Sequence, residues 1–135
     1  MVMNIRVLTP DRVILSTTAD EVILPGLTGQ IGILEGHATL LTALETGLLR
    51  FKLNGKWTLI IICGGLAEID RNQVTVLVNA VEELTNIKLS EAKKGLEKAT
   101  LAVENAETNK ARLDASVELR KATARLEAIN YLPKD

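Results

Sequence analysis

The period of the hydrophobic pattern changes near residue 85. From residue 4 to residue 84, apolar residues mostly alternate with polar ones and glycine is frequent. From residue 88 to residue 132, glycine nearly disappears, alanine becomes common, and apolar residues recur at steps of three and four. Alternation is typical of a half-buried strand, and steps of three and four are typical of a helix. The sequence therefore predicts a β domain over 1–84 and a helical domain over 85–135.

The β domain contains short strand patterns separated by turn residues. Asn54-Gly55 connects two of them and favours the positive φ angles of a type I′ hairpin turn. Successive strands without intervening helices predict an antiparallel sandwich or barrel. Consecutive apolar residues, as at 59–63, then indicate a strand covered on both faces. The expected strands are 4–9, 12–16, 19–26, 29–34, 38–44, 47–53, 56–65, 66–70 and 74–84.

The helical domain carries two narrow apolar stripes. The nine-residue step between the stripes breaks the register, and a turn near Asn109 would let them face each other in an αα-hairpin. Because residues 107–113 contain neither glycine nor proline, one continuous helix is a competing structure. Two helices bury little area, so a mobile hairpin and a rigidly docked hairpin both remain open. The stripes comprise Leu89, Ala92, Leu96, Ala99, Val103 and Ala106, and then Ala115, Leu119, Ala122, Leu126 and Ile129.

The composition argues against several classes of protein. The net charge is -1 and there are only three aromatic residues, so a basic or aromatic surface for nucleic acid is not expected. The start of the chain lacks a signal-peptide pattern. The longest apolar run, 59–63, is far shorter than the roughly 20 residues that span a bilayer. We therefore expect a soluble chain that reaches a membrane only through partners. The single cysteine, Cys63, excludes an internal disulfide.

The stretch GQIGILEGH, residues 29–37, contains three glycines and the only histidine. A phosphate-binding loop would need Gly-Lys-Ser/Thr entering a helix, whereas these glycines lead into a strand pattern. His37 has no cluster of cysteine, histidine or carboxylate residues at metal-ligand spacing. We expect the glycines to serve turns and close backbone approach. His37 is expected to be a structural residue or a subunit contact, and we predict no catalytic residue, metal or cofactor.

Basic residues gather on the second predicted helix. Arg120, Lys121 and Arg125 lie toward its C-terminal end, where positive charge favours the helix dipole without any partner. The alternative is a basic patch that binds an acidic surface. The charge pattern alone favours the first interpretation.

Several segments together resemble the epsilon subunit of F-type ATP synthases. They are GQIGILEGHATLLTALETGLLRF (29–51), GGLAEIDRNQVTVLV (64–78), LTPDRVI (8–14) and LRKATARLEAIN (119–130). The last two are most similar to the chloroplast and cyanobacterial branch, and the chain shows no transit peptide. The resemblance implies an antiparallel ten-stranded β-sandwich followed by an αα-hairpin. It also implies a peripheral location at the thylakoid membrane, on its stromal or cytoplasmic side.

The resemblance implies a non-catalytic subunit of the central stalk, which couples rotation of the c-subunit ring to the catalytic head. The implied partners are the gamma subunit, the c-ring and an acidic segment of the catalytic beta subunit. The C-terminal helices of this family extend and inhibit ATP hydrolysis. The implied c-ring contact is Leu27, Thr28, Gly29, Gln30 and Ile31. Arg120, Lys121 and Arg125 match the family's basic patch, which makes the acidic-partner interpretation the favoured one.

One segment departs from the family. Several bacterial members bind ATP through Ile/Leu-Asp-x-x-Arg-Ala at the start of the first helix. The matching residues here are Ile87, Lys88, Glu91 and Ala92, with both charges reversed. A carboxylate repels the phosphates that arginine attracts, so we predict weak or no ATP binding.

Two other functions compete with the rotor subunit. The first is a small β-sandwich enzyme such as a cupin-like lyase, whose metal site would need more than the single histidine present. The second is a generic adaptor that dimerises through its helices, whereas the rotor subunit is expected to be a monomer when isolated.

Overall fold

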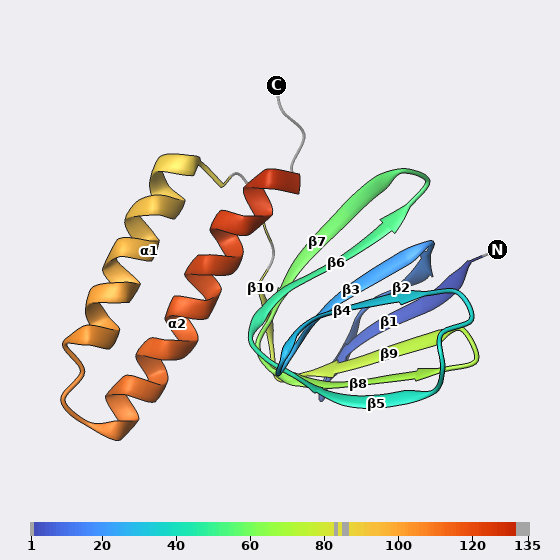
Figure 1. Cartoon of the computed structure of the whole chain (residues 1–135), viewed down its shortest axis with the longest axis horizontal. Coiled ribbons are helices and arrows are strands. Elements are labelled where there is room, and N and C mark those ends of the chain that lie inside the picture. Colours follow the sequence, from blue (N-terminus) through green and yellow to red (C-terminus); the bar gives the residue numbers. More distant parts are fainter. Residues whose placement is uncertain (1, 83, 85–86, 132–135) are drawn as a thin grey trace.

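The computed structural model describes residues 2–82, 84 and 87–131, and it contains a β domain followed by two helices (Figure 1). The predicted plan of about ten strands and a helical hairpin is confirmed. The strands are β1 (Met3–Thr9), β2 (Arg12–Ala19), β3 (Glu21–Gly26), β4 (Gly29–Leu34), β5 (Leu40–Leu44), β6 (Gly47–Leu53), β7 (Lys56–Ile62), β8 (Gly65–Asp70), β9 (Gln73–Val78) and β10 (Val81–Glu82). The helices are α1 (Leu89–Glu104), α2 (Asn109–Ala128) and the short 3₁₀ helix η1 (Ile129–Tyr131).

The strands form one sheet path, in the order β10-β7-β6-β3-β5-β8-β9-β1-β2, with β4 paired to β3. The expectation of a strictly antiparallel sheet is wrong at one place, because β1 and β9 are parallel. Parallel neighbours need a long crossover, and here the chain between them supplies seven other strands. Local alternation cannot report this pairing, since it records which face is buried and not which strand lies alongside.

The main core lies between the layers of the folded sheet. Its largest fully buried side chains come from β1, β3, β4, β6, β8 and β9 as well as β7. Strand β7 is covered on both faces, as its apolar run predicts: Ile60 and Ile62 face the main core, whereas Leu59 and Ile61 belong to a second cluster. The second cover is helix α2 and not a second sheet, which was the reason expected from the sequence.

Turn chemistry fixes where several strands end. Asn54 and Gly55 have φ angles of 53° and 80°, which confirms the predicted turn between β6 and β7. The strand expected over 56–65 instead ends at Ile62, because Gly64 and Gly65 both have positive φ. A Cβ atom on Gly65 would lie 2.1 Å from the carbonyl oxygen of Leu77, so only glycine fits there. The strand expected over 74–84 is divided into β9 and β10 opposite this bend.

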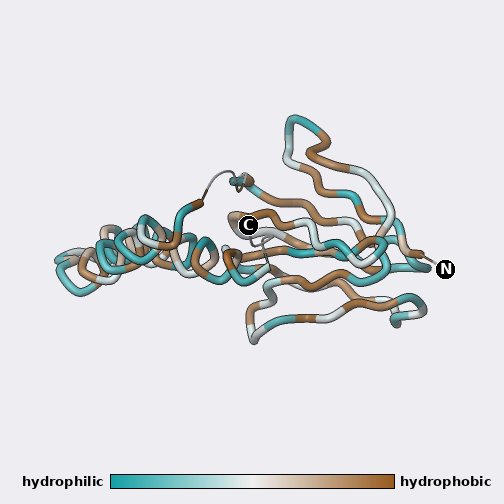
Figure 2. Tube along the Cα trace, turned by 90° about the horizontal axis from the view of Figure 1, so that it is seen from above, coloured by the Kyte–Doolittle hydropathy of each residue, from teal (hydrophilic) through white to brown (hydrophobic). Residues whose placement is uncertain are grey.

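The C-terminal helices form a hairpin and not one continuous helix. The turn precedes Asn109, which is already the first residue of α2. Thr108 caps α2, since its side chain accepts a hydrogen bond of 3.0 Å from the backbone N–H of Ala111. Helix α2 lies between α1 and strands β6 and β7 (Figure 1). Seen from above, the hairpin extends from one side of the sandwich, and hydrophilic residues are frequent along it (Figure 2).

Candidate functional site: the contact between the hairpin and the sandwich

Helix α2 has two buried faces. Ala122 is buried and lines a groove between the helices together with Ala99 of α1. Ala124 and Ala128 are buried against Leu48 of β6 and Ile61 of β7. The sequence analysis found the stripe that contains Ala122 but missed the sandwich-facing alanines. Their spacing of four residues was the available signal, because such residues share one side of a helix.

The strongest polar contact across this interface joins Arg125 of α2 to Glu82 of β10. Arg125 donates two hydrogen bonds, from Nε to Oε2 and from Nη2 to Oε1, both 2.6 Å long. These hydrogen bonds hold the pKa of Glu82 below its usual value, although desolvation acts in the opposite direction. The same pairing raises the pKa of Arg125. Both side chains are about one-third exposed, so the pair is partly shielded from solvent.

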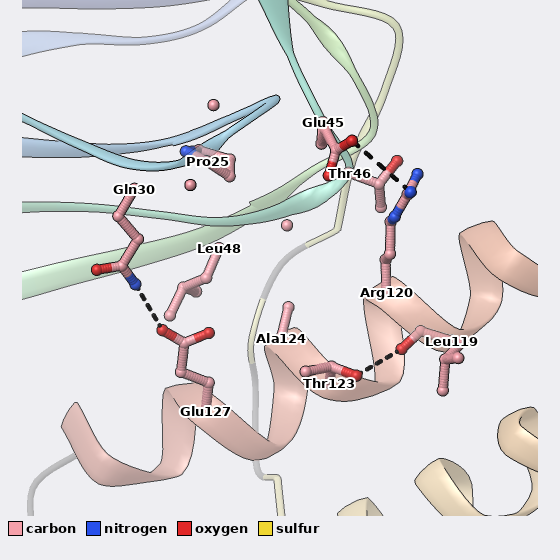
Figure 3. Close-up of a pocket in the computed structure, with 13 residues that line it drawn as sticks. Pro25, Gln30, Glu45, Thr46, Leu48, Leu119, Arg120, Thr123, Ala124 and Glu127 are labelled. Carbon is pink, nitrogen blue, oxygen red and sulfur yellow. Dashed lines mark hydrogen bonds and ion pairs between the residues drawn. The ribbon is translucent and has the colours of Figure 1, made fainter.

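The other predicted basic residues are also paired with carboxylates of this chain. Arg120 lies 3.6 Å from Glu45, at the end of β5, and Lys121 lies 3.3 Å from Glu118 of its own helix. Figure 3 shows Arg120 reaching from α2 toward Glu45. In the docked hairpin, two of the three basic residues are therefore held by the sandwich. The sequence could propose these cations but not their partners.

The predicted c-ring contact is the turn between β3 and β4. Gly26 and Gly29 are paired across the hairpin, which places Leu27 and Thr28 at its exposed tip. Gln30 donates a hydrogen bond of 3.1 Å from Nε2 to Oε1 of Glu127 on α2 (Figure 3). Ile31 packs against the main core. The turn and the helix thus border the same open groove, together with Leu48 and Arg120.

His37 lies at the bend between β4 and β5. Its backbone N–H donates to the carbonyl oxygen of Leu34 at 3.1 Å, and its ring Nδ1 lies 2.7 Å from the carbonyl oxygen of Ala38. The preceding Gly36 has a φ of 84° and donates its N–H to Oδ1 of Asn72. His37 is half-buried, and these contacts define the bend. Among the described residues, no group of three or more histidine, cysteine or carboxylate side chains could hold a metal ion.

The altered ATP motif lies at the start of α1. Lys88 is the N-cap residue, and its carbonyl oxygen accepts a hydrogen bond from the backbone N–H of Ala92. Glu91 is exposed in the first turn, where a carboxylate stabilises the positive end of the helix dipole. Ala92 is buried and Ile87 is half-buried. These charges therefore have a local role in the helix that needs no nucleotide.

The Glu82–Arg125 pair predicts a pH dependence of hairpin docking. Because docking lowers the pKa of Glu82, its contribution is fully present above the ordinary value of 4.5 and is lost as the pH falls through the lowered pKa. For a partly exposed pair we expect about 1 kcal/mol, or roughly fivefold in the docked population. Quenching of Trp57 fluorescence, followed from pH 7 to pH 3, should differ between the native chain and Glu82→Gln only at the higher pH. A constant difference across this range would contradict the assignment.

Comparisons with known proteins follow this architecture. The fold and the site define a β-sandwich subunit with an attached helical hairpin, and the sandwich matches the family described as "ATP synthase, Delta/Epsilon chain, beta-sandwich domain" over residues 2–84. The chain belongs to the ATP synthase epsilon-chain family. It is 82% identical over 132 residues to the chloroplastic epsilon chain of Phaeodactylum tricornutum, and 81% identical over 132 residues to that of Thalassiosira pseudonana. Each alignment covers 98% of this chain and 99% of the relative.

Solved structures share the fold at low sequence identity. A chain of the Euglena gracilis mitochondrial ATP synthase, solved as an OSCP/F1/c-ring assembly, superposes with a TM-score of 0.78 at 22% identity, over 96% of this chain and 81% of that chain. A chain of the Tetrahymena thermophila mitochondrial ATP synthase central stalk and c-ring superposes with a TM-score of 0.61 at 16% identity, over 96% of both chains. Both matches include the hairpin as well as the sandwich, because they extend over almost the whole of this chain.

Proposed function

We propose that this chain is a non-catalytic central-stalk subunit of a chloroplast ATP synthase, where it couples rotation of the c-ring to the catalytic head. The observation that carries the proposal is the near full-length likeness to chloroplastic ATP synthase epsilon chains at more than 80% identity. The titles of the two related structures name a c-ring, and one also names the central stalk. The expected location is the stromal side of the thylakoid membrane, where partners hold the chain. None of the described helices has the length and apolarity needed to cross a membrane.

An exposed row of apolar side chains supports a contact with another subunit. Cross-strand partners share one face of a sheet, and successive pairs here connect β5, β8, β9, β1 and β2. Leu66, Leu77 and Val13 of this row are about half exposed. Apolar patches of this kind mark protein contacts, and we assign this one to the gamma subunit. The row consists of Ala43, Leu66, Leu77, Leu8 and Val13.

We assign the c-ring contact to the tip of the β3–β4 turn. Leu27 is exposed there, and the turn projects an apolar side chain without cost to the main core. A photoreactive crosslinker on Leu27→Cys should label the c subunit in the assembled enzyme. The matched control is Lys56→Cys, an exposed position at the start of β7, which should give little c-subunit product. Equal labelling from both positions, or labelling only from Lys56→Cys, would contradict the assignment.

The docked hairpin supports a regulatory role for α2. An acidic segment of the catalytic beta subunit could bind Arg120 and Arg125 only after Glu45 and Glu82 release them. Intramolecular carboxylates thus compete with the partner for the same cations, and the inhibited state requires an undocked helix. Salt should weaken both sets of ion pairs, although the less exposed pair is screened less. The isolated chain is expected to sediment as a monomer, in contrast to an adaptor that dimerises through its helices.

Weak or absent ATP binding is a separate prediction. Glu91 presents a carboxylate at the helix start, and Lys88 is the only reversed position that could attract a phosphate. Titration of the isolated chain with ATP to about 5 mM should leave the amide NMR signals of residues 87–92 without a saturable shift. The variant Glu91→Arg, which restores the family's residue, is the control that should gain affinity. Saturable shifts in the native chain within this range would contradict the prediction.

A further inference from the structure

Two of the chain's three aromatic side chains meet on the outer face of β6 and β7. Trp57 is near the start of β7 and Tyr131 is the last residue of η1. Their ring centroids are 5.9 Å apart at an interplanar angle of 63°, an edge-to-face geometry. The sequence predicted an aliphatic core and offered no reason for two rings so far apart in the chain to be in contact.

Arg50 of β6 lies over both rings. Its Cζ atom is 4.7 Å from the ring centroid of Trp57 and 4.2 Å from that of Tyr131. Arg50 is only 9% exposed and is the one buried charged residue among those described. The planar guanidinium stacks on aromatic faces, and a cation–π contact strengthens when the cation is removed from water. Lys52 is also close to Trp57, at 5.7 Å from its centroid.

The position of Tyr131 decides what this cluster holds. Tyr131 comes three residues after the end of α2, and it packs with Leu48, Ile61, Ala124 and Ala128 in the docking cluster. Arg120 is tied to Glu45 toward the middle of α2, and Arg125 is tied to Glu82 one turn further on. Arg50 and Trp57 then hold the chain after the helix. Undocking of α2 therefore requires the ring of Tyr131 to leave the guanidinium of Arg50.

We propose that Arg50, Trp57 and Tyr131 form a latch that holds the hairpin on the sandwich and persists at salt concentrations that weaken the ion pairs. Salt screens exposed ion pairs strongly, whereas stacked and desolvated contacts are screened much less. The inference deepens the proposed regulation by naming the contact that opens last. It rests on the geometry of the isolated chain, so it stands or fails independently of any partner subunit.

The test uses the isolated full-length chain and compares Tyr131→Leu with Tyr131→Phe. Amide hydrogen exchange of α2, read by mass spectrometry, reports undocking, and acrylamide quenching of the single tryptophan reports exposure of Trp57. Leucine keeps apolar bulk but removes the ring, so exchange in α2 should increase roughly tenfold. Phenylalanine keeps the ring and should stay within about twofold of the native chain. The increase caused by Tyr131→Leu should persist from 0.1 M to 1 M KCl, whereas that of Glu82→Gln should shrink.

Arg50→Met provides the second arm, with Lys52→Met as its matched control. Each removes one positive charge from β6 near Trp57, but only Arg50 lies over both rings. Arg50→Met should increase exchange in α2, Lys52→Met should not, and the double variant Arg50→Met/Tyr131→Leu should exceed neither single variant by much. Tyr131→Leu lies outside the sandwich core, so it decides the matter if Arg50→Met disturbs β6. Unchanged exchange in Tyr131→Leu, an effect that vanishes in 1 M KCl, or additive single effects would overturn the latch.

Discussion

Replacing Ala128 with glutamate is expected to release the hairpin from the sandwich while the sandwich stays folded. Ala128 is 0% exposed and packs against Leu48 and Ile61. A carboxylate at that point would be buried without a partner, which costs about 3 kcal/mol or more. Undocking avoids this cost, because α2 contacts the sandwich over a limited area of β6 and β7. The docked population should therefore fall roughly 100-fold, since each 1.4 kcal/mol corresponds to a factor of ten.

Hydrogen exchange and tryptophan quenching measure this release directly. In Ala128→Glu, the amides of α2 should exchange rapidly and Trp57 should become accessible to acrylamide, whereas the amides of β1, β8 and β9 should keep their protection. Ala111→Glu is the matched control, because it makes the same change at an exposed position of the same helix. If Ala128→Glu keeps α2 protected, or if the sandwich strands lose protection with it, the hairpin and the sandwich do not separate in this way.

The change of hydrophobic period was sufficient to predict the order of the two structural parts. The strands expected at 29–34 and 47–53 have the observed bounds, because tight turns follow or precede each of them in the sequence. Alternation could not reveal the parallel pairing of β1 with β9, which depends on how the sheet folds over. It also could not reveal that Gly64 and Gly65 end β7 through their positive φ angles.

The candidate site was predicted only in part, since its contacts join residues distant in the sequence. The cations of α2 were visible as a cluster, but Glu82 is 43 residues before Arg125 and no local pattern links them. Ala124 and Ala128 were read as filler beside the main stripe, although they form the face that meets β6 and β7. Arg50 gave no signal at all, because an arginine within a strand usually indicates a solvent-facing position.

The contacts of α2 suggest how a small chain can hold an inhibitory segment in reserve. Glu45, Glu82 and the latch residues occupy the surfaces of the helix that a partner would need. Each contact is weak by itself, and together they set the balance between docked and released hairpins. Substitutions that leave the sandwich intact can therefore shift this balance in either direction.

Removing residues 89–135 tests the central claim most directly. The main core consists of residues from the sandwich alone, so the shortened chain is expected to fold and to assemble with the rotor. The assembled enzyme would then lack the segment that we assign to inhibition. If at least half of the complexes are inhibited by the native chain, ATP hydrolysis should rise about twofold or more on truncation.

The measurement is the ATP hydrolysis rate of the detergent-solubilised complex, reconstituted with either the full-length or the shortened chain at equal occupancy. Occupancy is checked by co-purification of the chain with the gamma subunit and the c-ring, and circular dichroism checks that the sandwich is folded. We predict a higher hydrolysis rate with the shortened chain, while both forms co-purify with the rotor. An equal or lower rate at full occupancy would contradict the regulatory role, and failure of both forms to co-purify would contradict the assignment to the central stalk.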